Sequence, residues 1–146
     1  MTDHPSNFDL LQTACYDAGR LLKVAETPLW VGAAMTGALE LRFETATLWI
    51  SVDPEFDTIL LHATAPDGMD ETPRRHPHAF WDECLGMCAQ WAWLMTNQQG
   101  YTDGVRFEFG NPDTPNTIAV DIVAVASGLE FAVARPADAA AGTSRS

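Results

Sequence analysis

The feature that most constrains the fold is a strict alternation of apolar and polar residues. Apolar side chains occupy every second position in two runs, 39–43 and 48–52, and the short link Thr45-Ala46 separates the runs. A side-chain period of two is that of a β-strand with one buried face. Two such runs joined by a short link predict a β-hairpin. The chain is therefore expected to contain antiparallel sheet with one apolar face.

Further strand-like runs surround this hairpin. A turn at Asp53-Pro54-Glu55 is followed by an apolar run at 58–63. Three more runs are expected at 105–109, 117–126 and 129–135, with Ser127-Gly128 as the turn between the last two. Residues 29–35 are a weaker candidate, because glycine in a strand interior is unfavourable and Gly32 lies within the run.

Two segments have helical periodicity instead. Ser6 and Asp9 resemble a capping box, and apolar residues at helical spacing follow to about residue 25, where Thr27-Pro28 ends the pattern. Cys15 lies in this apolar stripe and is expected to be a core thiol. A second helix is predicted over 79–99, ending at Gly100. The expected fold is α+β, a mainly antiparallel sheet with two amphipathic helices in the order α-β(3-4)-α-β(3).

The chain has 146 residues, which fits a single domain, expected over 1–135, and the composition of 136–146 predicts a disordered tail. Twenty acidic residues against eight basic ones give a net charge of −12. This charge disfavours nucleic acid and membrane surfaces as partners and favours a basic protein. With three cysteines, no basic N-terminal segment and no long apolar run, a cytoplasmic location without cofactors is expected.

The best candidate for chemistry is a group of four metal-ligating residue types. His76 and His78 precede Cys84 and Cys88, and two histidines with two cysteines could bind zinc. Both cysteines lie within the apolar stripe of the predicted second helix, which favours two core thiols over metal ligands. Asp82 and Glu83 beside Cys84 argue against a catalytic thiol. No other catalytic motif is present, so a metal-binding domain or enzyme centred on these four residues is kept as an alternative.

Two tryptophans fall on the polar side of their predicted elements. Trp93 lies opposite the apolar stripe of the second helix, and Trp49 alternates with the apolar residues of its strand. Tryptophan is enriched among interface anchors, so both are candidate contacts to a partner or to a second copy of the chain. The alternative is that another segment, such as the loop 65–78, covers them.

Charged residues are expected on the polar face of the sheet. Arg42, Arg106, Glu108 and Asp121 are the candidates for a polar binding surface around Trp49. Cross-strand pairs on a solvated face would account for the same pattern, and the alternation does not separate the two readings.

Three segments carry a resemblance to a known family. The runs 39–43 (Leu-Glu-Leu-Arg-Phe), 57–60 (Asp-Thr-Ile-Leu) and 93–103 resemble those of a small bacterial domain family of unknown function, over most of the chain to about Arg135. The resemblance implies no activity and no site. It draws attention to the amides of Asn97-Gln98-Gln99, which a helix end does not require.

These observations favour a non-catalytic, acidic protein-binding domain that neutralises a basic partner as immunity proteins or antitoxins do. The acidic charge and the two misplaced tryptophans support this hypothesis. A structural homodimer without a separate ligand is the remaining alternative.

Overall fold

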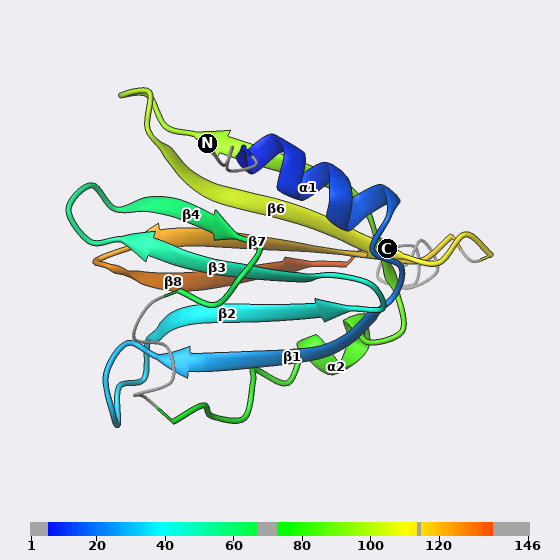
Figure 1. The fold of residues 1–146 in the computed structure, drawn as a ribbon, viewed down its shortest axis with the longest axis horizontal. Coiled ribbons are helices and arrows are strands. Elements are labelled where there is room, and N and C mark those ends of the chain that lie inside the picture. Colours follow the sequence, from blue (N-terminus) through cyan, green and yellow to red (C-terminus); the bar gives the residue numbers. More distant parts are fainter. Residues whose placement is uncertain (1–5, 67–72, 114, 136–146) are drawn as a thin grey trace, which may run out of the picture.

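Two antiparallel meanders of four strands each make up most of the computed structural model, which describes residues 6–66, 73–113 and 115–135. The first meander contains β1 (Leu21–Pro28), β2 (Thr36–Phe43), β3 (Thr47–Asp53) and β4 (Thr58–His62). The second contains β5 (Cys88–Thr96), β6 (Thr102–Gly110), β7 (Thr117–Val125) and β8 (Gly128–Ala134). Figure 1 shows the two meanders and the helix α1 (Asn7–Tyr16), which packs beside them.

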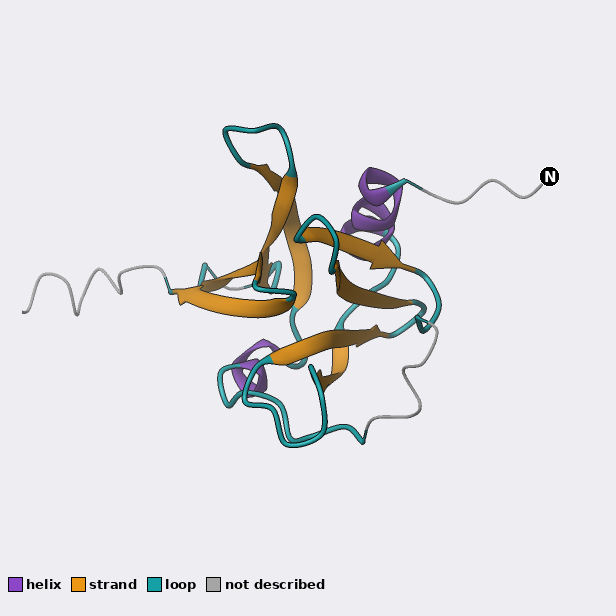
Figure 2. Ribbon diagram, turned by 90° about the vertical axis from the view of Figure 1, so that its left-hand side faces the viewer, coloured by secondary structure: helices purple, strands orange, loops and turns teal. Residues whose placement is uncertain are grey.

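In the described part of the chain, one residue pair joins the strands of the two meanders, Thr36 of β2 with Leu129 of β8. The resulting sheet has the order β4-β3-β2-β8-β7-β6-β5, with β1 paired to the other side of β2. Figure 2 shows that the strands curl around one interior as a half-barrel. Strand β5 therefore forms one end of the sheet, beside α1.

The interior is one continuous hydrophobic core. Buried side chains from α1, from both meanders and from the short helix α2 (Trp81–Cys84) belong to the same cluster. Trp81 is fully buried and makes edge-to-face contacts with Phe109 of β6 and Phe131 of β8. Because both meanders contribute to this core, neither buries its apolar face alone.

The hairpin expected from the alternation is confirmed. Strands β2 and β3 pair in antiparallel register, with Arg42 opposite Thr47 across the link Thr45-Ala46. The strands expected at 58–63, 105–109, 117–126 and 129–135 correspond to β4, β6, β7 and β8. Alternation identified β2 and β3, because each has one face on the core, whereas β4 and β7 were expected from more uniformly apolar runs.

The prediction for the first helix is correct at its start and wrong at its end. Ser6 Oγ accepts a hydrogen bond from the backbone N–H of Asp9 (3.1 Å), and Asp9 Oδ2 accepts one from the N–H of Ser6 (3.2 Å), which completes the capping box. The helix stops at Tyr16, and residues 21–28 form β1. Gly19 makes the change of direction with a φ of +84°, a conformation that glycine adopts without strain.

The predicted second helix over 79–99 is wrong. The helical part is the single turn α2, and the chain continues as β5. Gly100, expected to end a helix, lies in the β5–β6 turn, where Asn97 Oδ1 accepts hydrogen bonds from the N–H groups of Gln99 and Tyr101. The α+β fold with two amphipathic helices is thus replaced, in the described residues, by an antiparallel half-barrel with the helix α1 and the single turn α2.

Residues 29–35 are not a strand but connect β1 to β2. The expected tail at 136–146 lies outside the described residues, and the single domain over 1–135 stays a prediction. Among the described residues, no helix has the length and apolar content that crossing a membrane requires.

Candidate functional site

Strand β5 is the open edge of the second meander. It pairs with β6 along its length, and its first residue, Cys88, also bridges to Arg20. From Ala89 to Thr96, its other edge has no strand partner in the part of the chain that the structure describes. An unpaired edge presents a row of backbone N–H and C=O groups to any strand that approaches.

A β-bulge at Gln90 decides which side chains of β5 face outward. Ala89 pairs with Phe109 and Trp91 pairs with Glu108, so Gln90 is the extra residue between them. A one-residue insertion moves the side chains that follow to the opposite face of the sheet. Consequently Trp91 and Trp93 lie on the outer face, although without the bulge they would point into the core.

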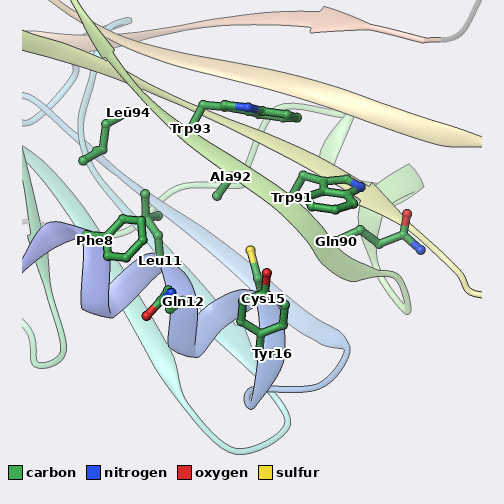
Figure 3. Close-up of a pocket in the computed structure, with 10 residues that line it drawn as sticks. All are labelled: Phe8, Leu11, Gln12, Cys15, Tyr16, Gln90, Trp91, Ala92, Trp93 and Leu94. Atoms are coloured by element: carbon green, nitrogen blue, oxygen red, sulfur yellow. The ribbon is translucent and has the colours of Figure 1, made fainter.

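Four large aromatic side chains stand exposed around a cavity of about 280 Å³ between α1 and β5. Phe8 and Tyr16 of α1 are 60% and 72% exposed, and Trp91 and Trp93 of β5 are 55% and 46% exposed. We call this cavity and its four aromatic residues the aromatic groove (Figure 3). Exposed apolar surface concentrated in one place is typical of an interaction site.

Smaller side chains form the rest of the groove. Ala92 and Leu94 of β5 point toward α1, where Leu11 and Cys15 meet them. Burial raises the pKa of the Cys15 thiol to about 11, so this thiol is neutral near pH 7. The groove therefore offers apolar contact and hydrogen-bonding amides at Gln12 and Gln90, but no reactive nucleophile from Cys15.

The outer face beside the groove brings together four of the residues that the sequence singled out. Trp93 is paired with Arg106 across β5 and β6, and Arg106 is paired with Asp121 across β6 and β7. The Arg106 Nε and Nη2 donate to the two carboxylate oxygens of Asp121 at 2.5 and 2.9 Å, and this carboxylate raises the pKa of Arg106. Glu108 lies opposite Trp91. Asp121 neutralises Arg106, so the net charge of Trp93, Arg106, Asp121 and Glu108 together is the single negative charge of Glu108.

Trp49 and Arg42 lie elsewhere, in the first meander. Trp49 is only 7% exposed, and the guanidinium of Arg74 lies over its ring at 5.2 Å. Glu40 forms ion pairs with Arg42 and Arg74 at 3.0 and 2.8 Å. Arg74 thus covers Trp49, and this tryptophan is buried instead of standing exposed as an anchor.

A second polar site is built around Glu26 of β1, whose side chain is completely buried. Its carboxylate accepts hydrogen bonds from Thr36 Oγ1 (2.8 Å), from the His78 N–H (2.8 Å) and from His78 Nδ1 (2.7 and 2.8 Å). Arg75 Nη2 lies 3.4 Å from it and donates to Thr36 Oγ1 at 2.6 Å. We call these four residues the Glu26 network.

The network keeps Glu26 ionised. Burial alone would raise the pKa of Glu26, but the hydrogen bonds from the backbone and side chain of His78 and from Thr36 outweigh burial and hold the pKa below its ordinary value. The His78 ring is half exposed and borders an open depression of about 450 Å³ between β2 and β8.

The four metal-ligand candidates are not brought together. His78 is bound to Glu26, Cys84 Sγ donates weakly to the backbone oxygen of Phe80 (3.9 Å), and Cys88 begins β5. Within the described ranges, no group of three or more histidine, cysteine or acidic residues is placed to hold a metal ion. Burial and the charge of Glu83 raise the pKa of Cys84 to about 12, and Arg135 opposes this only in part.

Sequence reasoning missed several of these residues. Trp91, Phe8 and Tyr16 are not among the residues that the sequence pattern singles out. A reading of 88–96 as a strand with a bulge would have put Trp91 beside Trp93. Glu26 and Arg75 had no local signal, because they are 49 residues apart.

A family model described as a family of unknown function (DUF6334) matches residues 19–138. The match includes all eight described strands and begins after α1. It confirms the resemblance to a family of unknown function. No curated protein and no solved structure matches the chain.

Proposed function

Because the chain belongs to this family of unknown function, we propose its function from its surface: it is a non-catalytic protein-binding domain. Its partner contributes an extended, basic segment that lies along β5 and places apolar side chains in the aromatic groove. The observation that carries the proposal is the coincidence of an open strand edge with four exposed aromatic side chains.

Strand addition explains why the groove lies where it does. A segment that pairs with an open edge gains main-chain hydrogen bonds, and its alternate side chains enter pockets beside that edge. Here the cavity between α1 and β5 would receive one set of side chains. Aromatic residues in such positions carry much of the binding energy of protein interfaces.

Charge selects the class of partner. The chain has a net charge of −12, and the outer face next to Trp91 and Trp93 has a net negative charge at Glu108 once Arg106 and Asp121 are paired. Such a surface speeds the encounter with a basic protein and repels an acidic one. Neutralisation of a basic partner, as immunity proteins and antitoxins do, is the role proposed for this binding.

The proposed location is the cytoplasm. Cys15, Cys84 and Cys88 are free thiols in the structure. Free cysteines are compatible with a reducing compartment.

A defined peptide tests the proposal directly. An eight-residue, end-blocked peptide of alternating lysine and valine is titrated into the ¹⁵N-labelled protein, and amide shifts give the dissociation constant. We expect saturable binding with shifts centred on 89–96. The double variant Trp91→Ala/Trp93→Ala should bind at least about tenfold more weakly, as hot-spot residues do. Trp30→Ala, at an even more exposed tryptophan outside the groove, is the matched control and should bind as the unaltered protein does.

Three outcomes would contradict the proposal. The first is equal affinity for a peptide with glutamate in place of lysine, which would remove the charge argument. The second is equal weakening by the Trp30 control. The third is a dimer in sedimentation velocity that dissociates in the double variant, because the occupant of the groove would then be a second copy of the chain.

A further inference from the structure

The Glu26 network holds the His78 ring in one orientation. The ionised carboxylate of Glu26 can only accept hydrogen bonds, so His78 Nδ1, at 2.7 and 2.8 Å from its oxygens, must be the donor. The hydrogen bond at one ring nitrogen sets the protonation of the other. In the neutral ring, Nε2 is therefore a hydrogen-bond acceptor.

This acceptor is not used within the fold. Nε2 of His78 has no hydrogen bond to any of the residues that the structure describes, and the side chain is half exposed. The hydrogen bonds to Glu26 use only the Nδ1 side of the ring and the backbone N–H of His78. They leave the Nε2 side of the half-exposed ring free of any role in holding the carboxylate.

The depression beside His78 has largely apolar walls. Phe80 and Phe131 lie against the His78 ring, with ring centroids 6.0 and 5.2 Å from it, and Leu129, Val133 and Met35 complete the apolar lining. Most of these walls belong to β8 and to the start of β2, so the depression is formed without a ligand. A mostly apolar concavity with few polar groups is the usual form of a small-molecule site.

The charges at the site select a neutral ligand. Thr36 Oγ1 is occupied by Glu26 and Arg75, and the other polar residue in the lining is Glu130. A carboxylate or phosphate would face Glu130 and the acidic charge of the whole chain. A hydroxyl group, by contrast, can donate to Nε2 without bringing a negative charge.

We propose that this depression is a second binding site, for a neutral, mainly apolar small molecule, aliphatic or aromatic, whose single hydroxyl group donates a hydrogen bond to His78 Nε2. The site lies on β2, β8 and the 78–80 segment, and it shares no residue with the aromatic groove. It therefore neither requires nor excludes the protein-binding function.

Two probes that differ by one hydroxyl group test this site. p-Cresol and toluene are titrated separately into ¹⁵N-labelled protein, and the ring nitrogens of His78 and the amides of β8 are followed by NMR. We expect p-cresol, and not toluene, to shift the Nε2 resonance. The ratio of the toluene to the p-cresol dissociation constant should fall about three- to tenfold in His78→Phe, because one hydrogen bond is lost. The ratio cancels the difference in hydrophobicity between the probes.

Val133→Phe is the control variant. It narrows the depression without removing Nε2, so it should weaken both probes and leave their ratio unchanged. If His78→Phe does not fold, the Nε2 shift in the unaltered protein and the effect of Val133→Phe still decide the question. The proposal is overturned if Nε2 does not respond to p-cresol, if neither probe binds up to its solubility limit, or if Val133→Phe binds both probes unchanged.

Discussion

At the scale of single residues, Glu26 is a charged side chain that is fully removed from solvent. It is a fully buried carboxylate held by Thr36, Arg75 and His78, so its replacement should be costly. Glu26→Gln removes the charge that accepts the hydrogen bonds of Thr36 and His78 and faces Arg75. We expect the free energy of unfolding at pH 7, measured with urea, to fall by about 3 kcal/mol. Glu130→Gln, at an exposed position on β8, should change it by less than about 0.5 kcal/mol.

The same residue predicts a pH dependence. The pKa of Glu26 is lower in the folded protein than in the unfolded chain, so ionised Glu26 stabilises the fold above the unfolded value of about 4.3. That stability is lost as the pH falls through the lowered folded value. Urea unfolding between pH 7 and pH 3 should show a steeper acid loss in the unaltered protein than in Glu26→Gln. An equal loss of unfolding free energy with falling pH in the two proteins would contradict the lowered pKa of Glu26.

At the scale of elements, glycine separates α1 from β1. A Cβ at Gly19 would lie 2.5 Å from Glu44 Oε1, which accepts a hydrogen bond from the Arg20 N–H. Gly86 has nearly the same positive φ, but a Cβ there would meet nothing within 4 Å. Gly86→Ala should therefore cost about 1 kcal/mol from strain alone, and Gly19→Ala at least about 1 kcal/mol more. Thermal unfolding of the two variants checks this, and equal costs would remove the steric argument.

The bulge in β5 explains why part of the fold was predictable and part was not. The hairpin of β2 and β3 has unbroken alternation over 39–43 and 48–52, and its prediction is confirmed. In β5 the extra residue Gln90 interrupts the period of two, and apolar residues fall at helix-like spacing from Cys84 to Met95. Since Ala, Met, Leu and Gln also favour helices, the local pattern and propensity both predicted the wrong element.

The residues of the candidate site were also predictable from the sequence only in part. Trp93 was expected off the core and is exposed, although the helix assumed for it is a strand. Trp49 was a separate candidate anchor, with cover by another segment as the alternative, and Arg74, which is 25 positions away in the sequence, covers its ring. The Glu26 network joins residues 10, 49 and 52 positions apart, so no sequence window contains it. Periodicity predicts which face a side chain takes, but not what the fold places over that face.

The bulge itself is testable. Deletion of Gln90 removes the extra residue, so the side chains that follow it in β5 should switch faces. Trp91 and Trp93 would then point inward, against residues that already fill the interior. We expect the deletion to unfold the protein or to cost more than about 3 kcal/mol. Gln90→Ala keeps the bulge and should cost less than about 1 kcal/mol. Tryptophan fluorescence during urea unfolding measures both, and a stable deletion variant would contradict the role of the bulge.

At the scale of the whole molecule, the two meanders share one core, while their strands are joined among the described residues by one residue pair, Thr36 with Leu129. Because neither meander can bury its apolar face alone, they should unfold together as one domain. Far-UV circular dichroism and tryptophan fluorescence should give coincident urea transitions. Two separate transitions would show two folding units and would contradict the single domain expected over 1–135.

The central claim is that β5 is an open edge which an extended basic segment completes. Hydrogen–deuterium exchange of the amides between Ala89 and Thr96 tests it most directly, in the free protein and with the lysine–valine peptide. We expect rapid exchange of the edge-facing amides of β5 in the free protein and slower exchange of those amides when the peptide is bound. Edge amides already protected in the free protein, or peptide protection confined to other strands, would contradict it.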